Sequence, residues 1–154
     1  MTNYPTLAAL ADHPLTDDSG HPVSLASFIG KRVLIFFFPK ADTPGCTTQA
    51  CGFRDSFPQI TEKGAVVIGI SPDAPPALAK WRKKQNLPYI LLSDPDHVIA
   101  ERFGAWGEKS MYGKKYMGIV RSHFVFDETG KVAAAEVKVS PTDSIKKGVA
   151  ELLK

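Results

Sequence analysis

The sequence lacks long runs of apolar residues and blocks of basic residues. Its longest strictly apolar run, residues 33–38, is far shorter than the roughly 20 residues that a membrane helix needs. No block of five or six basic residues occurs, and the formal net charge of +3 is mild. We therefore expect a protein that neither spans a membrane nor binds nucleic acid.

Targeting segments and repeats are also missing. The first residues, Met1 to Pro5, contain no basic region followed by an apolar stretch and no arginine-rich bias, so neither a signal peptide nor a transit peptide is expected. The 154 residues show no repeats, low-complexity tracts or linkers, which predicts a single domain over residues 1–154. The expected location is cytoplasmic, where thiols stay reduced and cysteines tend to be catalytic, redox-sensing or metal-binding.

Cysteine is scarce, and three motifs that would explain the two cysteines or imply a cofactor are absent. A Cys-x-x-Cys motif, typical of thioredoxin-type redox proteins, does not occur. A structural zinc site is not expected, because no histidine has ligand spacing to the cysteines. The Gly-x-Gly-x-x-Gly fingerprint of dinucleotide-binding proteins does not occur either, and no metal, flavin or nicotinamide cofactor is expected. The histidines are His13, His21, His97 and His123.

The chain alternates short β-like runs with amphipathic segments. Strands are predicted at 33–38, 64–70 and 89–92, with a hairpin of 122–126 and 131–137 around the turn 127–130. Helices are predicted at 46–56, 75–85, 98–103 and 143–153, the first ended or bent by Pro58. This order predicts an α/β fold: a mostly parallel central sheet with helices on both faces and the hairpin as antiparallel edge strands.

Cys46 is the most informative residue, because it follows the first strand and opens the first predicted helix. Pockets in such sheets lie beyond the carboxyl ends of the strands, where Cys46 falls. We expect Thr43 as N-cap, Pro44 at the first helical position and Cys46 in the first turn, with Gly45 leaving the sulfur approachable. Free backbone N–H groups and the helix dipole there favour thiolate over thiol. The alternative is a buried cysteine that acts as a small hydrophobic residue.

Cys51, the second cysteine, lies five residues farther along the same helix. That spacing corresponds to a rotation of about 140° and a Cα separation of ~8.7 Å, whereas a disulfide needs less than about 7 Å. Either Cys51 is a bystander, or the first turns unwind after Cys46 is oxidised. Thr47, Thr48 and Gly52 are weak helix formers, which permits unwinding.

These residues resemble those of a known family. Pro39-x-x-x-Thr43-x-x-Cys46 is similar to the active-site signature of the peroxiredoxins, and residues 43–51 resemble the Q branch, also called bacterioferritin comigratory protein. The resemblance spans almost the whole chain. Further matches are Gly69-Ile70-Ser71, Leu92-Ser93-Asp94, Trp106-Gly107-Glu108-Lys109, Met111-Tyr112-Gly113-Lys114, Gly118-Ile119-Val120-Arg121-Ser122 and Phe126-Asp127-Glu128-Thr129-Gly130-Lys131.

The resemblance implies a thioredoxin-like fold and reduction of hydrogen peroxide or organic hydroperoxides. It assigns Cys46 as the peroxidatic cysteine, Thr43 as a hydroxyl that contacts sulfur and substrate, and Pro39 as a shield of the pocket. It also selects Arg121 as the distant guanidinium. Residue type alone does not distinguish Arg121 from the other arginines, which are Arg32, Arg54, Arg82 and Arg102. Such donors suit a reaction in which thiolate attack pushes negative charge onto the departing oxygen.

The resemblance further implies a resolving cysteine and a reductant. Cys51 matches the residue that forms an intramolecular disulfide with the oxidised peroxidatic cysteine in many members of this branch. An external dithiol, thioredoxin or similar, is the implied reductant, and the implied assembly is a monomer. His123 stands where many relatives carry threonine or another small residue, and we interpret it as neutral for catalysis, although it could alter the pocket floor.

Three other functions remain open from the sequence. The main alternative is a thiol redox sensor that peroxide oxidises without efficient turnover. A disulfide reductase is disfavoured by the missing Cys-x-x-Cys motif. A binding module with a degenerate site is disfavoured by the intact set of Pro39, Thr43, Cys46 and Arg121.

Overall fold

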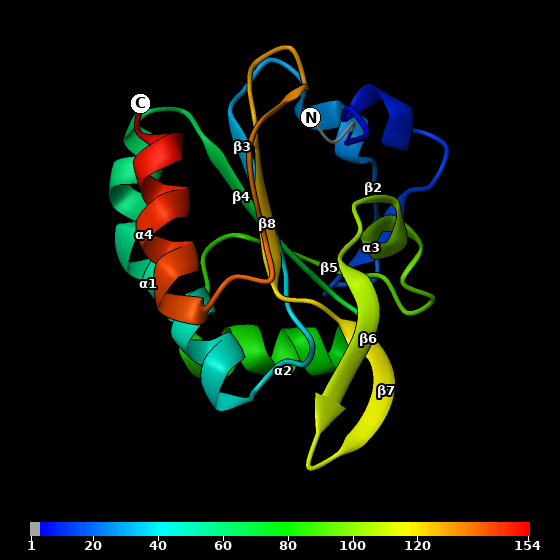
Figure 1. Cartoon of the computed structure of the whole chain (residues 1–154). Coiled ribbons are helices and arrows are strands. Elements are labelled where there is room, and N and C mark those ends of the chain that lie inside the picture. Colours follow the sequence, from blue (N-terminus) through cyan, green and yellow to red (C-terminus); the bar gives the residue numbers. More distant parts are fainter. Residues whose placement is uncertain (1–3) are drawn as a thin grey trace.

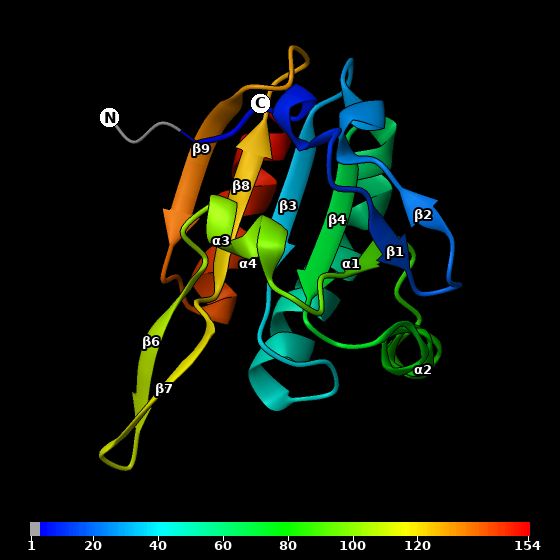
Figure 2. The same cartoon turned by 90° about the vertical axis from the view of Figure 1, so that its right-hand side faces the viewer.

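A seven-stranded mixed sheet forms the centre of the computed structural model, which describes residues 4–154. Residues 1–3, part of the segment in which no targeting peptide is expected, lie outside the described residues. The strand order is β2-β1-β5-β4-β3-β8-β9 (Figures 1 and 2). The strands are β1 (Leu15–Asp17), β2 (Pro22–Val23), β3 (Val33–Phe37), β4 (Val66–Ser71), β5 (Ile90–Ser93), β8 (Ser122–Phe126) and β9 (Val132–Val137).

The middle of the sheet is parallel and its flanks are antiparallel. β3 pairs with β4 and β4 with β5 in parallel, while β8 runs antiparallel to β3 and β9 antiparallel to β8. The predicted hairpin, with its turn at 127–130, is therefore confirmed. β1 and β2, which were not predicted, complete the other edge by antiparallel pairing. The three-residue and two-residue lengths of these strands explain why their apolar pattern was too short to recognise.

The sheet buries both faces, as the sequence of β3 illustrates. Its side chains alternate between two hydrophobic clusters: Leu34 and Phe36 belong to one, and Val33, Ile35 and Phe37 to the other. The first cluster lies under α1 (Pro44–Glu62), α2 (Pro75–Gln85) and α4 (Pro141–Leu152), and the second under α3 (Val98–Arg102) and the 3-10 helices Ala8–Leu10 and Leu25–Phe28. Helices thus cover both faces, as predicted.

Helices α1 and α4 lie side by side, and two glycines set how closely they pack (Figure 1). A Cβ on Gly52 of α1 would overlap the side chain of Ile145 of α4. A Cβ on Gly148 of α4 would lie 2.6 Å from Leu34 of β3 and 3.2 Å from Phe53 of α1. Gly52 is therefore a packing position as well as a weak helix former.

The structure differs from the sequence prediction at Pro58 and at residues 106–119, for which no strand was predicted. Pro58 neither ends nor visibly interrupts α1, which continues to Glu62. The last turn is held by the buried Ile60 and by the Thr61 hydroxyl, which donates to main-chain oxygens one turn earlier, and such contacts can outweigh the cost of an internal proline. The second difference is a two-stranded antiparallel sheet of β6 (Trp106–Met111) and β7 (Lys114–Ile119), which extends away from the body (Figure 2).

Among residues 4–154, none of the helices combines the length and the apolar composition that spanning a membrane requires.

Candidate active site

Cys46 lies in the first turn of α1, just beyond the carboxyl end of β3. Thr43 has the extended backbone of an N-cap, and Pro44 begins the helix, as the sequence predicted. The main-chain N–H of Thr47 donates to the carbonyl of Thr43 at 2.8 Å, which closes the first helical turn around the cysteine. The Cys46 side chain is 1% exposed. Its sulfur is thus held at a helix N-terminus, where the backbone favours an anion.

The loop before α1 is fixed by side chains of neighbouring elements. The Thr43 hydroxyl, expected beside the sulfur, donates to the main-chain oxygen of Lys40 at 2.7 Å. The carboxylate of Asp73 accepts from the N–H of Ala41 at 2.7 Å. Pro39 lies half-buried two residues beyond the end of β3, directly after the buried Phe38. These contacts hold the segment between the strand and the cysteine in one conformation.

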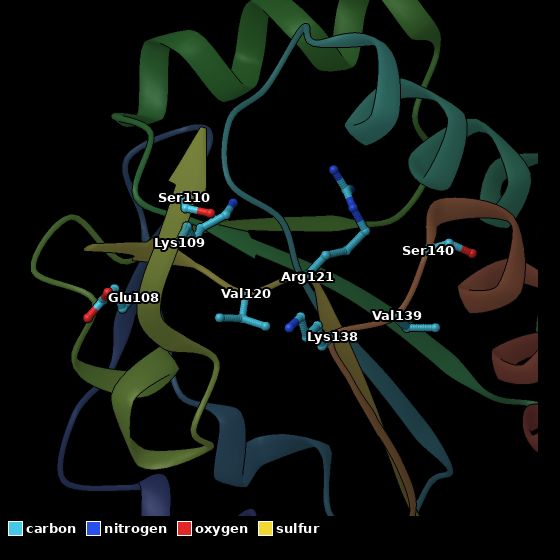
Figure 3. Close-up of a pocket in the computed structure, with 8 residues that line it drawn as sticks. All are labelled: Glu108, Lys109, Ser110, Val120, Arg121, Lys138, Val139 and Ser140. Carbon is cyan, nitrogen blue, oxygen red and sulfur yellow. The ribbon is translucent and has the colours of Figure 1, made fainter. Parts of the chain in front are cut away.

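Arg121 is the charged side chain that reaches the sulfur. Its Nη2 donates to Sγ of Cys46 at 3.4 Å, although the two residues are 75 positions apart in the chain. Figure 3 shows the side chain extending from the start of β8 towards the first turns of α1. A Cβ on Gly45 would lie 3.0 Å from the same Nη2. Glycine, which has no Cβ, therefore makes room for the guanidinium. The arrangement combines a nucleophile with a fixed cationic donor.

A pocket lies on the other side of the Arg121 side chain. Val120, Arg121, Lys138 and Ser140 line one side of it, and Glu108, Lys109 and Ser110 of β6 line the other (Figure 3). Lys109 donates to the main-chain oxygen of Ile119 at 2.8 Å. Burial, followed by the positive charge of Arg121, lowers the pKa of Lys109. The pocket therefore brings solvent to the arginine from the β6–β7 side.

A buried chain of polar side chains continues from Arg121 into the core. Nη1 of Arg121 donates to Oε1 of Gln49 at 2.8 Å, and Nε2 of Gln49 donates to Oγ of Ser144 at 2.8 Å. The Ser144 oxygen lies 2.7 Å from Nδ1 of His123. Gln49, Ser144 and His123 are each at most 1% exposed. The sequence left open that His123 alters the pocket floor, but the ring lies in the core at the end of this chain.

Burial lowers the pKa of His123 to about 4, and the nearby Glu136 and Lys147 have smaller, opposing effects. The ring is therefore neutral in the folded protein at neutral pH, whereas an unfolded histidine titrates near about 6.5. Its contribution to stability is complete above about pH 6.5 and is lost as the pH falls towards about 4.

We expect the free energy of unfolding to fall by about 3 kcal/mol over this pH range because of His123 alone. A His123→Asn variant lacks a group that titrates there, so its stability should decline less between pH 6.5 and pH 4. Urea unfolding of both proteins at several pH values measures the difference. Parallel curves for the two proteins would contradict a buried neutral histidine.

Cys51 faces a different neighbour from Cys46. It is half-buried, and its thiol donates to Oε1 of Gln85, the last residue of α2, at 3.5 Å. Both cysteines are free thiols, and α1 is continuous through both. The structure is therefore the reduced form with its helix intact, and the two sulfurs do not meet in it.

Two further hydrogen bonds tie the first half of α1 to its surroundings. The indole N–H of Trp81 donates to the Thr47 hydroxyl at 3.3 Å. The Tyr89 hydroxyl donates to the main-chain oxygen of Ala50 at 2.7 Å, and burial raises the pKa of Tyr89, so this donor keeps its proton. Unwinding of the helix start must break both bonds.

Within residues 4–154, histidine, cysteine, aspartate and glutamate side chains form no group of three or more that could hold a metal ion.

Comparisons with known proteins agree on one family. The model of the AhpC/TSA family matches residues 7–135. A putative peroxiredoxin bcp of Haemophilus influenzae is 57% identical over 110 residues, which are 71% of this chain and 71% of that protein. Peroxiredoxin Bcp of Escherichia coli is 50% identical over 118 residues, which cover 77% of this chain and 76% of that one.

Solved structures give the same result. A mutant of Peroxiredoxin Q from Xanthomonas campestris matches with a TM-score of 0.89 at 34% identity, covering 97% of this chain and 95% of that one. A structure of the bacterioferritin comigratory protein of the same organism, which concerns its alkyl peroxide reduction activity, matches with a TM-score of 0.89 at 33% identity and the same coverage.

Proposed function

The chain belongs to the AhpC/TSA family as a peroxiredoxin of the Bcp, or Q, type, and from this membership we propose how its residues share the reduction of a hydroperoxide. The protein is a thiol peroxidase with a thioredoxin-like fold. We propose Cys46 as the peroxidatic cysteine within a single domain over residues 1–154. The observation that carries this assignment is the 3.4 Å contact from Arg121 to the Cys46 sulfur at a helix N-terminus.

The chemical step is a two-electron oxidation of sulfur. The Cys46 thiolate attacks one peroxide oxygen, an S–O bond forms and the O–O bond breaks. Sulfur becomes sulfenic acid, and the departing oxygen takes a proton and leaves as water or an alcohol. Negative charge develops on that departing oxygen, so donors fixed in advance lower the barrier.

Three groups around Cys46 are suited to hold the peroxide. The Arg121 guanidinium stays charged and offers several N–H donors. The Thr43 oxygen, fixed by its bond to Lys40, keeps lone pairs that can accept the proton of a hydroperoxide. Pro39, half-buried at the end of the strand, shields the site from water.

Cys51 is proposed as the resolving cysteine. Its thiolate attacks the Cys46 sulfenic acid, the disulfide forms and water leaves. Because the intact helix separates the two sulfurs, its first turns must open, breaking the contacts to Gln85, Trp81 and Tyr89. An external dithiol then reduces the disulfide. We propose thioredoxin or a similar protein for this step, and a monomeric enzyme in the cytoplasm.

Treating the reduced protein with one equivalent of hydrogen peroxide distinguishes the roles of Cys46 and Cys51. Reduced wild-type protein should consume it rapidly, lose two hydrogens in intact mass and yield a Cys46–Cys51 cross-link in its peptide map. Cys51→Ser should consume it as fast but gain one oxygen on Cys46, and its turnover with thioredoxin should fall severalfold or more, because no internal thiol resolves the sulfenate.

Two other results would change the assignment. Rapid consumption by the wild type without a cross-link would remove Cys51 as the resolving residue. No rapid consumption would remove the peroxidase and favour the redox sensor. Oxidation of Cys46 without recycling by thioredoxin would also favour the sensor.

A further inference from the structure

The chain of hydrogen bonds behind Arg121 joins three separate elements at one buried point. Gln49 lies one turn after Cys46 on α1, Ser144 lies near the start of α4, and His123 lies on β8 two residues after Arg121. Alternation along the strand directs Arg121 and His123 to the same side of the sheet, and helical spacing directs Cys46 and Gln49 to the same face of α1. The functional assignments above use none of Gln49, Ser144 and His123.

The donors and acceptors in this chain all run in one direction. A guanidinium can only donate, so Oε1 of Gln49 must face Arg121 and its NH₂ group must face Ser144. The Ser144 oxygen accepts that bond, and within residues 4–154 Nδ1 of His123 is the one acceptor bonded to this hydroxyl, so we assign its single hydrogen to Nδ1. His123 is therefore the terminal acceptor, with its proton on Nε2. That nitrogen has no hydrogen-bond partner among residues 4–154.

The terminal acceptor supports the same orientation of the Gln49 amide from the other end of the chain. If His123 did not take the Ser144 hydrogen, the hydroxyl could donate to Gln49 instead, and the amide could then turn its NH₂ group towards the guanidinium. Two donors would face each other, and Arg121 would lose its fixed partner. A long, flexible arginine side chain loses rotamer entropy when it is held, so such a partner decides how well the guanidinium stays in place.

We propose that His123 and Ser144 are positioning residues for the peroxidase reaction: acting through Gln49, they hold the Arg121 guanidinium against the Cys46 sulfur. This inference rests on the proposed roles of Cys46 and Arg121. Neither residue touches the sulfur. Their effect is on a donor that must already be in place when charge develops on the peroxide.

The test is the pH profile of Cys46 alkylation by iodoacetamide. It is measured in a Cys51→Ser background, in which Cys46 is the only thiol that can react. Ser144→Ala and His123→Leu each remove one member of the chain. Both should move the midpoint of the profile to higher pH and slow oxidation of Cys46 by hydrogen peroxide about tenfold. His123→Asn keeps an acceptor oxygen at the position of Nδ1, so its alkylation profile should keep the midpoint of the protein with His123.

Two controls separate the positioning of Arg121 from a general effect of the substitutions on stability. Val125→Ala removes packing from the same face of β8 without touching the polar chain, so it should lower the melting temperature but leave the alkylation midpoint unchanged. In an Arg121→Ala background, Ser144→Ala should change the oxidation rate by less than about twofold, because the group that it positions is already gone.

The proposal fails if Ser144→Ala and His123→Leu leave the midpoint unchanged, or if they slow oxidation equally with and without Arg121. It also fails if Val125→Ala shifts the midpoint as much as they do. A wild-type protein that consumed no peroxide would overturn the proposed function instead, and alkylation, which needs no peroxide, would still decide whether the chain positions Arg121.

Discussion

Replacing Cys46 by serine is expected to abolish peroxide consumption, with a loss on the order of 10⁴-fold or more in the rate constant. The serine hydroxyl is almost fully protonated at neutral pH and cannot form a sulfenic acid. The substitution is nearly isosteric at a position that is 1% exposed, so the Arg121 contact and the helix should survive. Stopped-flow measurement of peroxide loss by the reduced protein gives the rate.

Cys51→Ser is the matched control for this experiment, since it makes the same chemical change on the same helix. Its first turnover should keep the wild-type rate, because Cys51 bonds to Gln85 and does not contact the Cys46 sulfur. Near-UV circular dichroism checks that both variants are folded. Peroxide consumption by Cys46→Ser at the wild-type rate would reject Cys46 as the nucleophile.

Arg121→Ala is expected to slow the oxidation of Cys46 by about 10²- to 10³-fold, the usual cost of removing one fixed donor from a reacting oxyanion. The loss is compounded because Arg121 also bonds Gln49, which would then face an empty space. Arg121→Lys keeps the positive charge but cannot bond Cys46 and Gln49 at once with a planar group, so an intermediate rate is expected. Single-turnover oxidation of reduced protein measures all three rates.

Arg102→Ala is a suitable control for the general loss of a positive charge. Arg102 pairs with Asp12 at 2.8 Å on the surface, where such pairs contribute little. The oxidation rate of Arg102→Ala should stay within about twofold of the wild-type rate, because substitutions far from the site couple weakly to it. Equal losses in Arg102→Ala and Arg121→Ala would show that net charge, not a placed donor, governs the reaction.

The sequence predicted the central elements because their burial leaves a recognisable apolar pattern, continuous in the strand and periodic in the helix. The run at 33–38 became β3, and the segment at 75–85 became α2 with the same bounds. The β6–β7 hairpin was not predicted, because most of its side chains are exposed and leave no apolar pattern to recognise. Its turn also lacks the usual Asn-Gly signal: Tyr112 and Gly113 both have positive φ, at 52° and 78°.

The site was predictable where residues are close in sequence, and less so where they are not. Thr43, Pro44 and Cys46 form one local helix start, so their arrangement followed from spacing. Arg121 could not be chosen from residue type, and the family resemblance selected it; the structure gives its distance to the sulfur.

The polar chain of Gln49, Ser144 and His123 was missed because its members are far apart in the sequence. One signal was available: His123 interrupts the otherwise largely apolar strand 122–126, where a buried polar residue requires a partner.

The close approach of α1 and α4 at Gly52 divides α1 into units of different local stability. The buried residues before it are Cys46, Gln49 and Ala50, whereas those after it include the core side chains Phe53 and Ile60. Opening the first turns therefore exposes little apolar area, and amide hydrogens there should exchange through local opening rather than global unfolding. With the roles proposed for Cys46 and Cys51, the enzyme can alternate between thiol and disulfide states with its core closed, without passing through an aggregation-prone intermediate at every turnover.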